Sequence, residues 1–169
     1  MNRASRLGIA TIAAAAAVAL LSGCSVITDL VGGGGSAVRD ADSAEITEGG
    51  DLSVFTLEIG DCFNDTAGEQ VSELPVVPCA DPHDNEVYYE HEMPDGEFPG
   101  DDAISAAAEE NCFAQFEGFV GIAYADSVLE YNYLTPTTGS WEDYGDRLIQ
   151  CIVYDPSAQV QGTLAGVAR

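Results

Sequence analysis

Basic residues are nearly missing from this sequence. Its 169 residues include no lysine and five arginines, against 29 aspartates and glutamates, so the formal net charge at pH 7 is −24. Such a surface repels phosphates, which argues against nucleic acids and anionic lipid headgroups as partners. Solubility is the plainest role of so much negative charge, and basic protein surfaces are its natural complement. We therefore expect no nucleic-acid binding and only weak, diffuse association of cations.

Motifs of the common catalytic and cofactor sites are absent as well. The sequence has no Gly-x-Ser-x-Gly elbow, and its glycine run at residues 32–35 is not followed by the Lys and Ser or Thr of a phosphate-binding loop. It has no Cys-x-x-Cys pair, which argues against a zinc site. Eleven acidic residues between positions 81 and 110 could offer oxygen ligands, but their spacing does not match a calcium-binding loop. We predict no catalytic residue, no cofactor and no metal site, and we expect a protein that is not an enzyme.

The longest apolar run, at residues 7–21, is too short for a transmembrane helix, which needs about 20 residues. Arg3 and Arg6 precede it, and Leu-Ser-Gly-Cys follows it at positions 21–24. This order is typical of a bacterial lipoprotein signal peptide, cut before a cysteine whose thiol then carries a diacylglycerol. We predict a signal peptide at residues 1–23, lipidation of Cys24, and anchoring at the extracellular face of the cell membrane. An ordinary signal peptide cut nearby, or an uncleaved anchor, is the alternative.

The remaining chain divides into a tether and a domain. Residues 24–50 are rich in glycine and polar residues and lack aromatic side chains, so they cannot bury enough apolar surface to offset the entropy of ordering. We expect a flexible tether at residues 24–50 and a folded extracellular domain at residues 51–169.

Four cysteines remain after Cys24, and they are Cys62, Cys79, Cys112 and Cys151. An even number in a small exported domain indicates two disulfides, and four cysteines allow three pairings. We favour Cys62–Cys79, which closes a short local loop, together with Cys112–Cys151, which joins a predicted helix to a late strand. Each bridge is expected to add about 2–4 kcal/mol by restricting the unfolded chain.

Hydrophobic periodicity predicts one principal helix and several strands. Apolar residues recur at helical spacing after residues 101 and 102, two aspartates that suit the positive end of a helix dipole. The expected buried stripe is Ile104, Ala108, Cys112, Phe116 and Val120, widened by Phe113. Strands are predicted at residues 52–59, 75–78, 86–91, 128–134, 147–154 and 161–167. The pattern indicates an α+β domain, with a small, mainly antiparallel sheet, one principal helix packed on it, and two disulfides.

Short motifs follow one another in a characteristic order over residues 58–165. They are Gly60-Asp61-Cys62-Phe63, Val76-Val77-Pro78-Cys79, Asp81-Pro82-His83, Glu86-Val87, Cys112, Tyr133 with Thr135-Pro136-Thr137, Ser140-Trp141, Gly145-Asp146-Arg147 and Cys151. In this order they resemble the actinobacterial septum formation family, whose domain occurs in exported and membrane proteins. The resemblance implies a link to cell division, supports two bridges among the four cysteines, and supplies no catalytic residue. The family's tryptophan and Gly-Asp-Arg motif lie closer together than here, which predicts a longer turn at residues 142–144.

Four residues are candidates for ligand binding. His83 and Glu86 can bind a metal or transfer protons, although a histidine at such a turn also serves a structural role. Trp141, together with Tyr131, Tyr133 and Tyr144, could line a carbohydrate or peptide groove or else belong to the core of the sheet. Arg147, the only arginine in the body of the domain, could hold a ligand or pair with an acid such as Asp146. We look for a concave site around His83, Trp141 and Arg147.

The sequence as a whole favours a lipid-anchored envelope protein with a non-enzymatic binding or scaffolding role, linked to septum formation or growth. Its expected partner is an envelope protein or a wall component. One alternative is a lipoprotein that binds a cation or small ligand through His83 and Glu86. The least favoured is an envelope hydrolase that uses His83 with Glu86 or Asp84 as acid and base.

Overall fold

The computed structural model describes residues 35–68 and 71–169. The expected signal peptide, the lipidation site Cys24 and residues 24–34 of the expected tether lie outside the described residues. The described strands are β1 (Val38–Arg39), β2 (Ile46–Glu48), β3 (Gly50–Ser53), β4 (Cys62–Phe63), β5 (Glu73–Val77), β6 (Asn85–Glu92), β7 (Glu130–Leu134) and β8 (Leu148–Tyr154). The helices are α1 (Asp101–Val120) and α2 (Thr138–Tyr144), with short 3-10 turns at η1 (Val54–Thr56) and η2 (Tyr124–Asp126). Over these ranges, neither helix has the length and apolar character that crossing a membrane requires.

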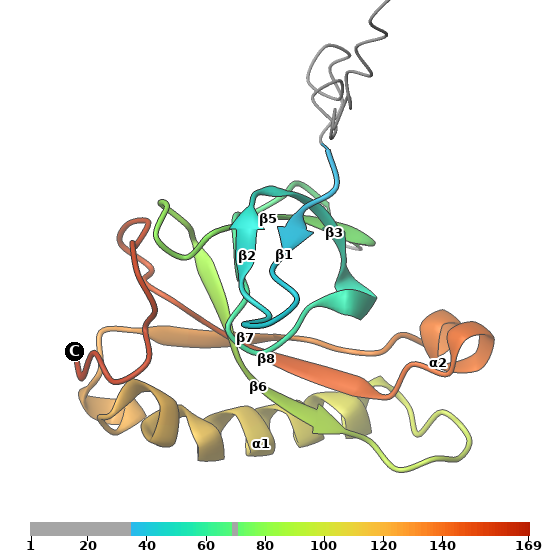
Figure 1. Ribbon diagram of the computed structural model, residues 1–169. Helices are drawn as coiled ribbons and strands as arrows, with labels where there is room; N and C mark the ends of the chain where they lie inside the picture. The colour runs from blue at the N-terminus through green and yellow to red at the C-terminus, as the bar shows by residue number, and fades with distance from the viewer. Residues whose placement is uncertain (1–34, 69–70) are drawn as a thin grey trace, which may run out of the picture. The chain divides into compact units, whose positions relative to one another are not determined.

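A curled, antiparallel sheet of six strands organises the domain, in the order β3–β5–β4–β6–β8–β7, while β1 and β2 form a separate hairpin (Figure 1). The long strands β6 and β8 form its centre and pair from Asn85 opposite Tyr154 to Glu92 opposite Leu148. The predicted α+β fold with a mainly antiparallel sheet is confirmed.

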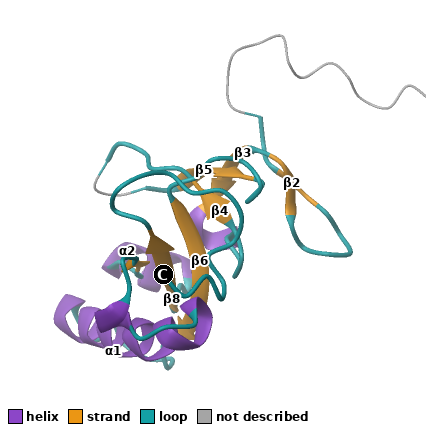
Figure 2. Cartoon of the chain, turned by 90° about the vertical axis from the view of Figure 1, so that its left-hand side faces the viewer, coloured by secondary structure: helices purple, strands orange, loops and turns teal. Residues whose placement is uncertain are grey.

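Two hydrophobic clusters cover the two faces of this sheet. Helix α1 contacts β6, β7 and β8, and its cluster includes Phe116, Tyr88 and Ile149. The curl of β3, β4 and β5 closes over the other face, where Val76 and Val87 are fully buried. Figure 2 shows α1 on one side of the β6–β8 pair and β3 with β5 on the other. The domain thus has two cores that share the central strands.

The principal helix matches its prediction closely. The buried residues of α1 are the five of the expected stripe, which are Ile104, Ala108, Cys112, Phe116 and Val120. The helix ends where Gly121 takes a left-handed φ of 89° and donates its backbone N–H to the carbonyl of Glu117. Phe113 is 56% exposed, so the expectation that it widens the buried stripe is wrong.

The favoured disulfide pairing is also confirmed. Cys62–Cys79 joins β4 to the turn after β5, and Cys112–Cys151 joins α1 to β8. The second bridge lies inside the core, because both of its cysteines are fully buried.

Three local expectations differ from the structure. The strand expected at 52–59 ends at Ser53, whose hydroxyl accepts the backbone N–H of Phe55 and so begins η1. The strand expected at 161–167 is absent from the described residues, which show only an isolated bridge between His83 and Val160 there. The longer turn expected at 142–144 is instead the last part of helix α2. Thr137 caps the N-terminus of this helix.

The structure differs from the expected tether over residues 35–50. Ile46 is 8% exposed and belongs to the cluster that contains Val76. Arg39 forms an ion pair with Asp61 that spans 22 residues of sequence. Ile46 and Arg39, together with backbone hydrogen bonds between Asp51 and residues 35 and 37, hold this segment on the domain, and neither side chain stands out in a composition of glycine and polar residues.

Candidate functional site

The four sequence-predicted ligand residues fall into two pairs at opposite ends of β6. His83 and Glu86 lie at its beginning, where Asn85 pairs with Tyr154. Arg147 lies at its far end, because its carbonyl accepts the backbone N–H of Met93 just after the strand. At about 3.3 Å per residue, a strand of this length separates the two ends by roughly 20 Å or more. The structure therefore does not bring all four residues into one concave site.

The first pair is buried and ties down the end of the chain. His83 is fully buried, and its backbone N–H and carbonyl both bond to Val160. The Glu86 carboxylate accepts hydrogen bonds from the Thr163 hydroxyl and the Leu164 backbone N–H, each at 2.6 Å. Burial raises the pKa of Glu86, and these hydrogen bonds offset part of that rise. The His83 backbone and the Glu86 side chain thus hold the segment near residues 160–164 against the sheet.

The His83 ring has one nitrogen engaged and one free of partners. Nδ1 lies 2.9 Å from the carbonyl oxygen of Asp81. Nε2 is buried and has no hydrogen-bond partner within residues 35–68 and 71–169. A buried polar atom without a partner is uncommon and calls for a physical account.

The second pair is a stacked contact inside the domain. The Arg147 guanidinium lies 3.7 Å from the centroid of the Trp141 ring, and it donates to the carbonyls of Trp141 and Asp146. Trp141 is 3% exposed, and its indole N–H donates to the carbonyl of Gly96 at 2.9 Å. These contacts position α2 against the loop after β6, and the indole has little surface left to line a groove.

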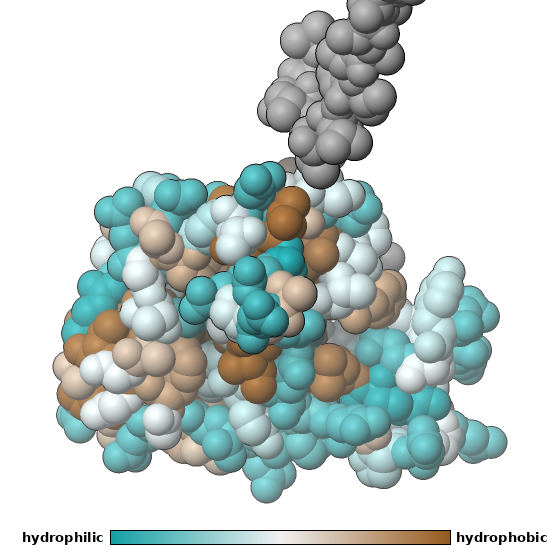
Figure 3. Space-filling view, in the orientation of Figure 1, coloured by the Kyte–Doolittle hydropathy of each residue, from teal (hydrophilic) through white to brown (hydrophobic). Residues whose placement is uncertain are grey.

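A hollow lies between η1 and α2, and we name it the η1–α2 cleft. Its volume is about 520 Å³, within the size range of small-ligand sites. Figure 3 shows the surface hollowed between the lobe that carries η1 and the lobe that carries α2. The lining residues are Val54, Phe55, Val71, Leu134, Thr135, Thr137, Ser140, Tyr144, Asp146, Leu148 and Gln150.

Two exposed aromatic rings flank this cleft. Phe55 of η1 is 52% exposed and Tyr144 of α2 is 77% exposed, and their ring centroids lie 5.9 Å apart. Large apolar side chains that meet at the surface commonly mark a binding site. Sequence reasoning missed Phe55, because a phenylalanine in a strand-like run is ordinarily a core residue. Tyr144 is one of the four aromatic residues that the sequence offered for a carbohydrate or peptide groove, and it does line the cleft.

The polar groups of the η1–α2 cleft suit binding more than acid–base chemistry. Ser140 donates its hydroxyl hydrogen to Asp146 Oδ2 at 2.9 Å and accepts the backbone N–H of Thr137. The described residues that line the cleft include no histidine that could take a proton from Ser140. Asp146 and Gln150 offer oxygen atoms to a donor or a cation. The cleft thus pairs aromatic rings with acceptors, which fits a cationic or hydrogen-bonding ligand.

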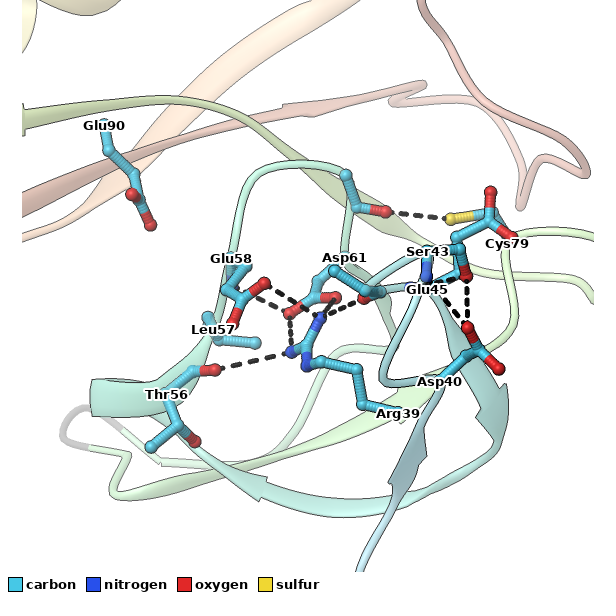
Figure 4. Close-up of polar contacts among 12 residues, drawn as sticks. Arg39, Asp40, Ser43, Glu45, Thr56, Leu57, Glu58, Asp61, Cys79 and Glu90 are labelled. Atoms are coloured by element: carbon cyan, nitrogen blue, oxygen red, sulfur yellow. Dashed lines mark hydrogen bonds and ion pairs between the residues drawn. The ribbon is translucent and has the colours of Figure 1, made fainter.

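Ion pairs occupy the arginines of the described chain. Arg39 holds both carboxylate oxygens of the buried Asp61, at 2.8 and 2.6 Å, with Glu58 3.6 Å away (Figure 4). Arg147 pairs with Asp95 at 3.6 Å, and Arg169 pairs with Asp155 at 3.1 Å. The remaining carboxylates far outnumber these three cations, so the surface is complementary to a basic partner.

Comparison with known proteins gives one match. A family model described as "Septum formation" matches residues 59–168, which is more than half of the chain. The matched region includes both disulfides, both helices and the α2 side of the cleft, whereas η1 and the β1–β2 hairpin precede it. No curated protein and no solved structure matches the chain.

Proposed function

Since the chain belongs to the septum formation family, we propose that it is a lipid-anchored envelope protein with a non-enzymatic binding or scaffolding role in septum formation or growth. The family supports the link to septum formation. The order of two arginines, an apolar run and the Leu-Ser-Gly-Cys motif ending at Cys24 supports the lipid anchor. The two disulfides fit an oxidising compartment outside the membrane.

The η1–α2 cleft carries the binding role in this proposal. The single observation behind it is the exposed pair of Phe55 and Tyr144 beside a concave, partly apolar surface. The two rings contact each other and present a joint aromatic surface, against which an apolar or aromatic side chain of the partner packs, as anchor residues do in protein interfaces. Asp146 at the cleft, and the acidic surface around it, favour lysine or arginine next to that anchor. The proposed partner is therefore a basic segment of another envelope protein.

Hydrolysis through His83 is the alternative that this geometry supports least. A general acid or base must come within hydrogen-bond reach of its substrate, and His83 is fully buried below the C-terminal segment. The η1–α2 cleft, where a substrate has room, lies toward the other end of β8.

Capture of partners from membranes tests the role of the cleft. The folded domain serves as bait, and the proteins that it retains are compared with those retained by a Phe55→Ala/Tyr144→Ala variant. We expect the double variant to lose the specific partner, because alanine removes the aromatic surface against which the anchor packs. Phe113→Ala is the matched control, since Phe113 is also exposed but lies on α1.

Two outcomes of this experiment would contradict the proposal. One is an identical set of retained proteins on the double variant and on the wild type. The other is repeated capture with no enriched envelope protein at all. Unfolding curves of each variant confirm that the domain remains folded before the comparison is made.

Metabolic labelling tests the anchor separately. Cells that express the full chain are grown with radiolabelled palmitate, and the protein is isolated and counted. We expect label in the wild type and none in Cys24→Ser, because serine offers no thiol for the thioether bond. Wild-type protein without label, in a membrane fraction or in the medium, would refute lipid anchoring.

A further inference from the structure

We propose that reduction of the Cys62–Cys79 disulfide converts Cys62, His83 and Glu86 into a buried site for a divalent transition-metal ion such as Zn²⁺. One possible ligand atom from each of the three residues lies within 4.8 Å of the other two. Cys62 and His83 are fully buried, and Glu86 is 1% exposed. They come from β4, from the turn before β6 and from β6 itself, so adjacent strands bring together residues that the sequence separates.

His83 is already arranged as a metal ligand. A carbonyl oxygen only accepts, so the contact between Nδ1 and the Asp81 carbonyl places the ring hydrogen on Nδ1. In the neutral ring this leaves a lone pair on Nε2, the nitrogen that has no partner among the described residues. Metal-bound histidines commonly donate their other ring N–H to a carbonyl in this way. The orphan nitrogen is evidence for a ligand that is independent of the cysteine.

The disulfide controls whether this site can form. A bonded disulfide sulfur is a poor metal ligand, whereas a thiolate binds zinc strongly. Cys79 is partly exposed and Cys62 is fully buried, so an attacking thiolate reaches the Cys79 sulfur and the Cys62 sulfur departs as a thiolate. Cys62 is thus released beside His83 and Glu86.

The reductant in this thiol–disulfide exchange is a dithiol protein or a small dithiol, which supplies the two electrons and two protons that the disulfide takes up. The first thiol of the reductant forms a mixed disulfide with Cys79, and its second thiol displaces Cys79 and closes the oxidised reductant. The dithiol loses two electrons and two protons, and these reduce the protein disulfide to two thiols. Binding of the metal then expels the proton of the Cys62 thiol.

The ligand types select the class of metal. Sulfur, imidazole nitrogen and a carboxylate oxygen together suit Zn²⁺ and Co²⁺, while calcium and magnesium prefer oxygen alone. The freed Cys79 thiolate or a water molecule completes a tetrahedral set of four. Reduction would thus exchange a covalent bond between β4 and the turn after β5 for a metal bridge between β4 and β6.

Cobalt binding to a Cys79→Ser variant tests the site without any reductant. This change frees Cys62 and leaves Cys112–Cys151 intact. We expect the variant to bind Co²⁺ with a near-ultraviolet thiolate-to-cobalt absorption band, which Zn²⁺ then abolishes by competition. Adding His83→Gln should weaken cobalt binding about tenfold or more. The oxidised wild type and a Cys62→Ser/Cys79→Ser variant, which lacks the same bridge, should show no band.

Two results would overturn the proposal. One is a folded Cys79→Ser variant without a thiolate band, and the other is a band that His83→Gln leaves unchanged. If Cys79→Ser does not fold, the full chain is reduced, freed of reductant by desalting, and treated with an alkylating agent with and without Zn²⁺. We expect Zn²⁺ to protect Cys62 in the wild type but not in His83→Gln, and unprotected Cys62 in the wild type would refute the site.

Discussion

Glu86 is a carboxylate held almost entirely out of water, and burial raises its pKa above the ordinary value of 4.5. In the unfolded chain it ionises near its ordinary pKa, whereas in the folded chain it keeps its proton to higher pH. Its contribution to the free energy of unfolding is therefore greatest below pH 4.5 and falls as pH rises through the folded pKa. A single group of this kind changes the free energy of unfolding by at most about 1.4 kcal/mol per pH unit.

Glu86→Gln removes this titration while it keeps the shape of the side chain. We expect the difference in free energy of unfolding, variant minus wild type, to increase as pH is raised from 4 to 8. Urea unfolding at each pH measures it. Asp155→Asn is the control, because hydrogen bonds from Ser157 lower the pKa of Asp155 below its ordinary value of 3.8, so its difference should stay nearly constant from pH 4 to 8. Parallel curves for wild type and Glu86→Gln would show that Glu86 is not perturbed.

Arg39 is the residue that most directly holds the segment 35–50 on the domain. Its guanidinium meets both oxygens of Asp61, whose side chain is 3% exposed. Arg39→Ala leaves that carboxylate buried without its cation, so we expect it to lower the free energy of unfolding by about 2–3 kcal/mol. Arg169→Ala is the matched control, because it removes the same charge from a more exposed pair and should cost less than about 1 kcal/mol. Equal losses in the two variants would mean that Arg39 contributes only surface charge.

At the level of elements, the sequence predicted those with a regular hydrophobic pattern. It did not predict features that depend on local contacts or on an irregular backbone. Helix α1 was predictable, since its buried stripe repeats over all of its turns. Strand β6 departs from the regular alternation of a strand, because a bulge between Val87 and Tyr89 places both Tyr88 and Tyr89 on the helix side. Nothing in the composition of residues 86–91 signals that extra residue.

The candidate site was harder to predict than the fold because it depends on short elements. Helix α2 has seven residues including a glycine, and its cap at Thr137 and its contacts with Arg147 hold it in place. The sequence identified His83 and Glu86 as a pair. It could not show that the pairing of β4 with β6 brings Cys62 next to them. It likewise could not place Phe55 opposite Tyr144, since η1 interrupts what reads as a strand.

The two disulfides should contribute unequally to stability. In the chain-entropy description the gain grows with the closed loop, and the loops span 39 residues for Cys112–Cys151 and 17 for Cys62–Cys79. We expect replacement of both cysteines by alanine to lower the free energy of unfolding by about 4 kcal/mol for the long loop and about 3 kcal/mol for the short one. Burial of both cysteines of the long loop adds a packing loss to the larger figure.

Urea unfolding of the two double variants under non-oxidising handling measures this difference. Each variant keeps the other bridge, so each serves as the control for the other. A greater loss on removal of Cys62–Cys79 would contradict the order. It would mean that this bridge stabilises the native contacts around β4 more than it restricts the unfolded chain.

For the whole molecule, charge opposes folding. The sequence carries 29 acidic residues and five arginines, so compaction brings like charges together. Salt shortens the Debye length from about 30 Å at 0.01 M to about 3 Å at 1 M, which weakens this repulsion. It also weakens the ion pairs of Arg39, Arg147 and Arg169, but these are few and partly buried. Repulsion is therefore the larger of the two terms.

We expect the melting temperature at pH 7 to rise as NaCl increases from 0.01 to 1 M, by about 4 °C for each 1 kcal/mol of repulsion that is screened. Circular dichroism on heating measures it, and KCl should act as NaCl does, since screening does not distinguish the two cations. Near pH 3, where most carboxylates are protonated, the rise should largely vanish. A melting temperature that falls with salt at pH 7 would show that the three ion pairs outweigh the repulsion between carboxylates. The acidic surface would then not be uncompensated, and the argument that it attracts a basic partner would fail.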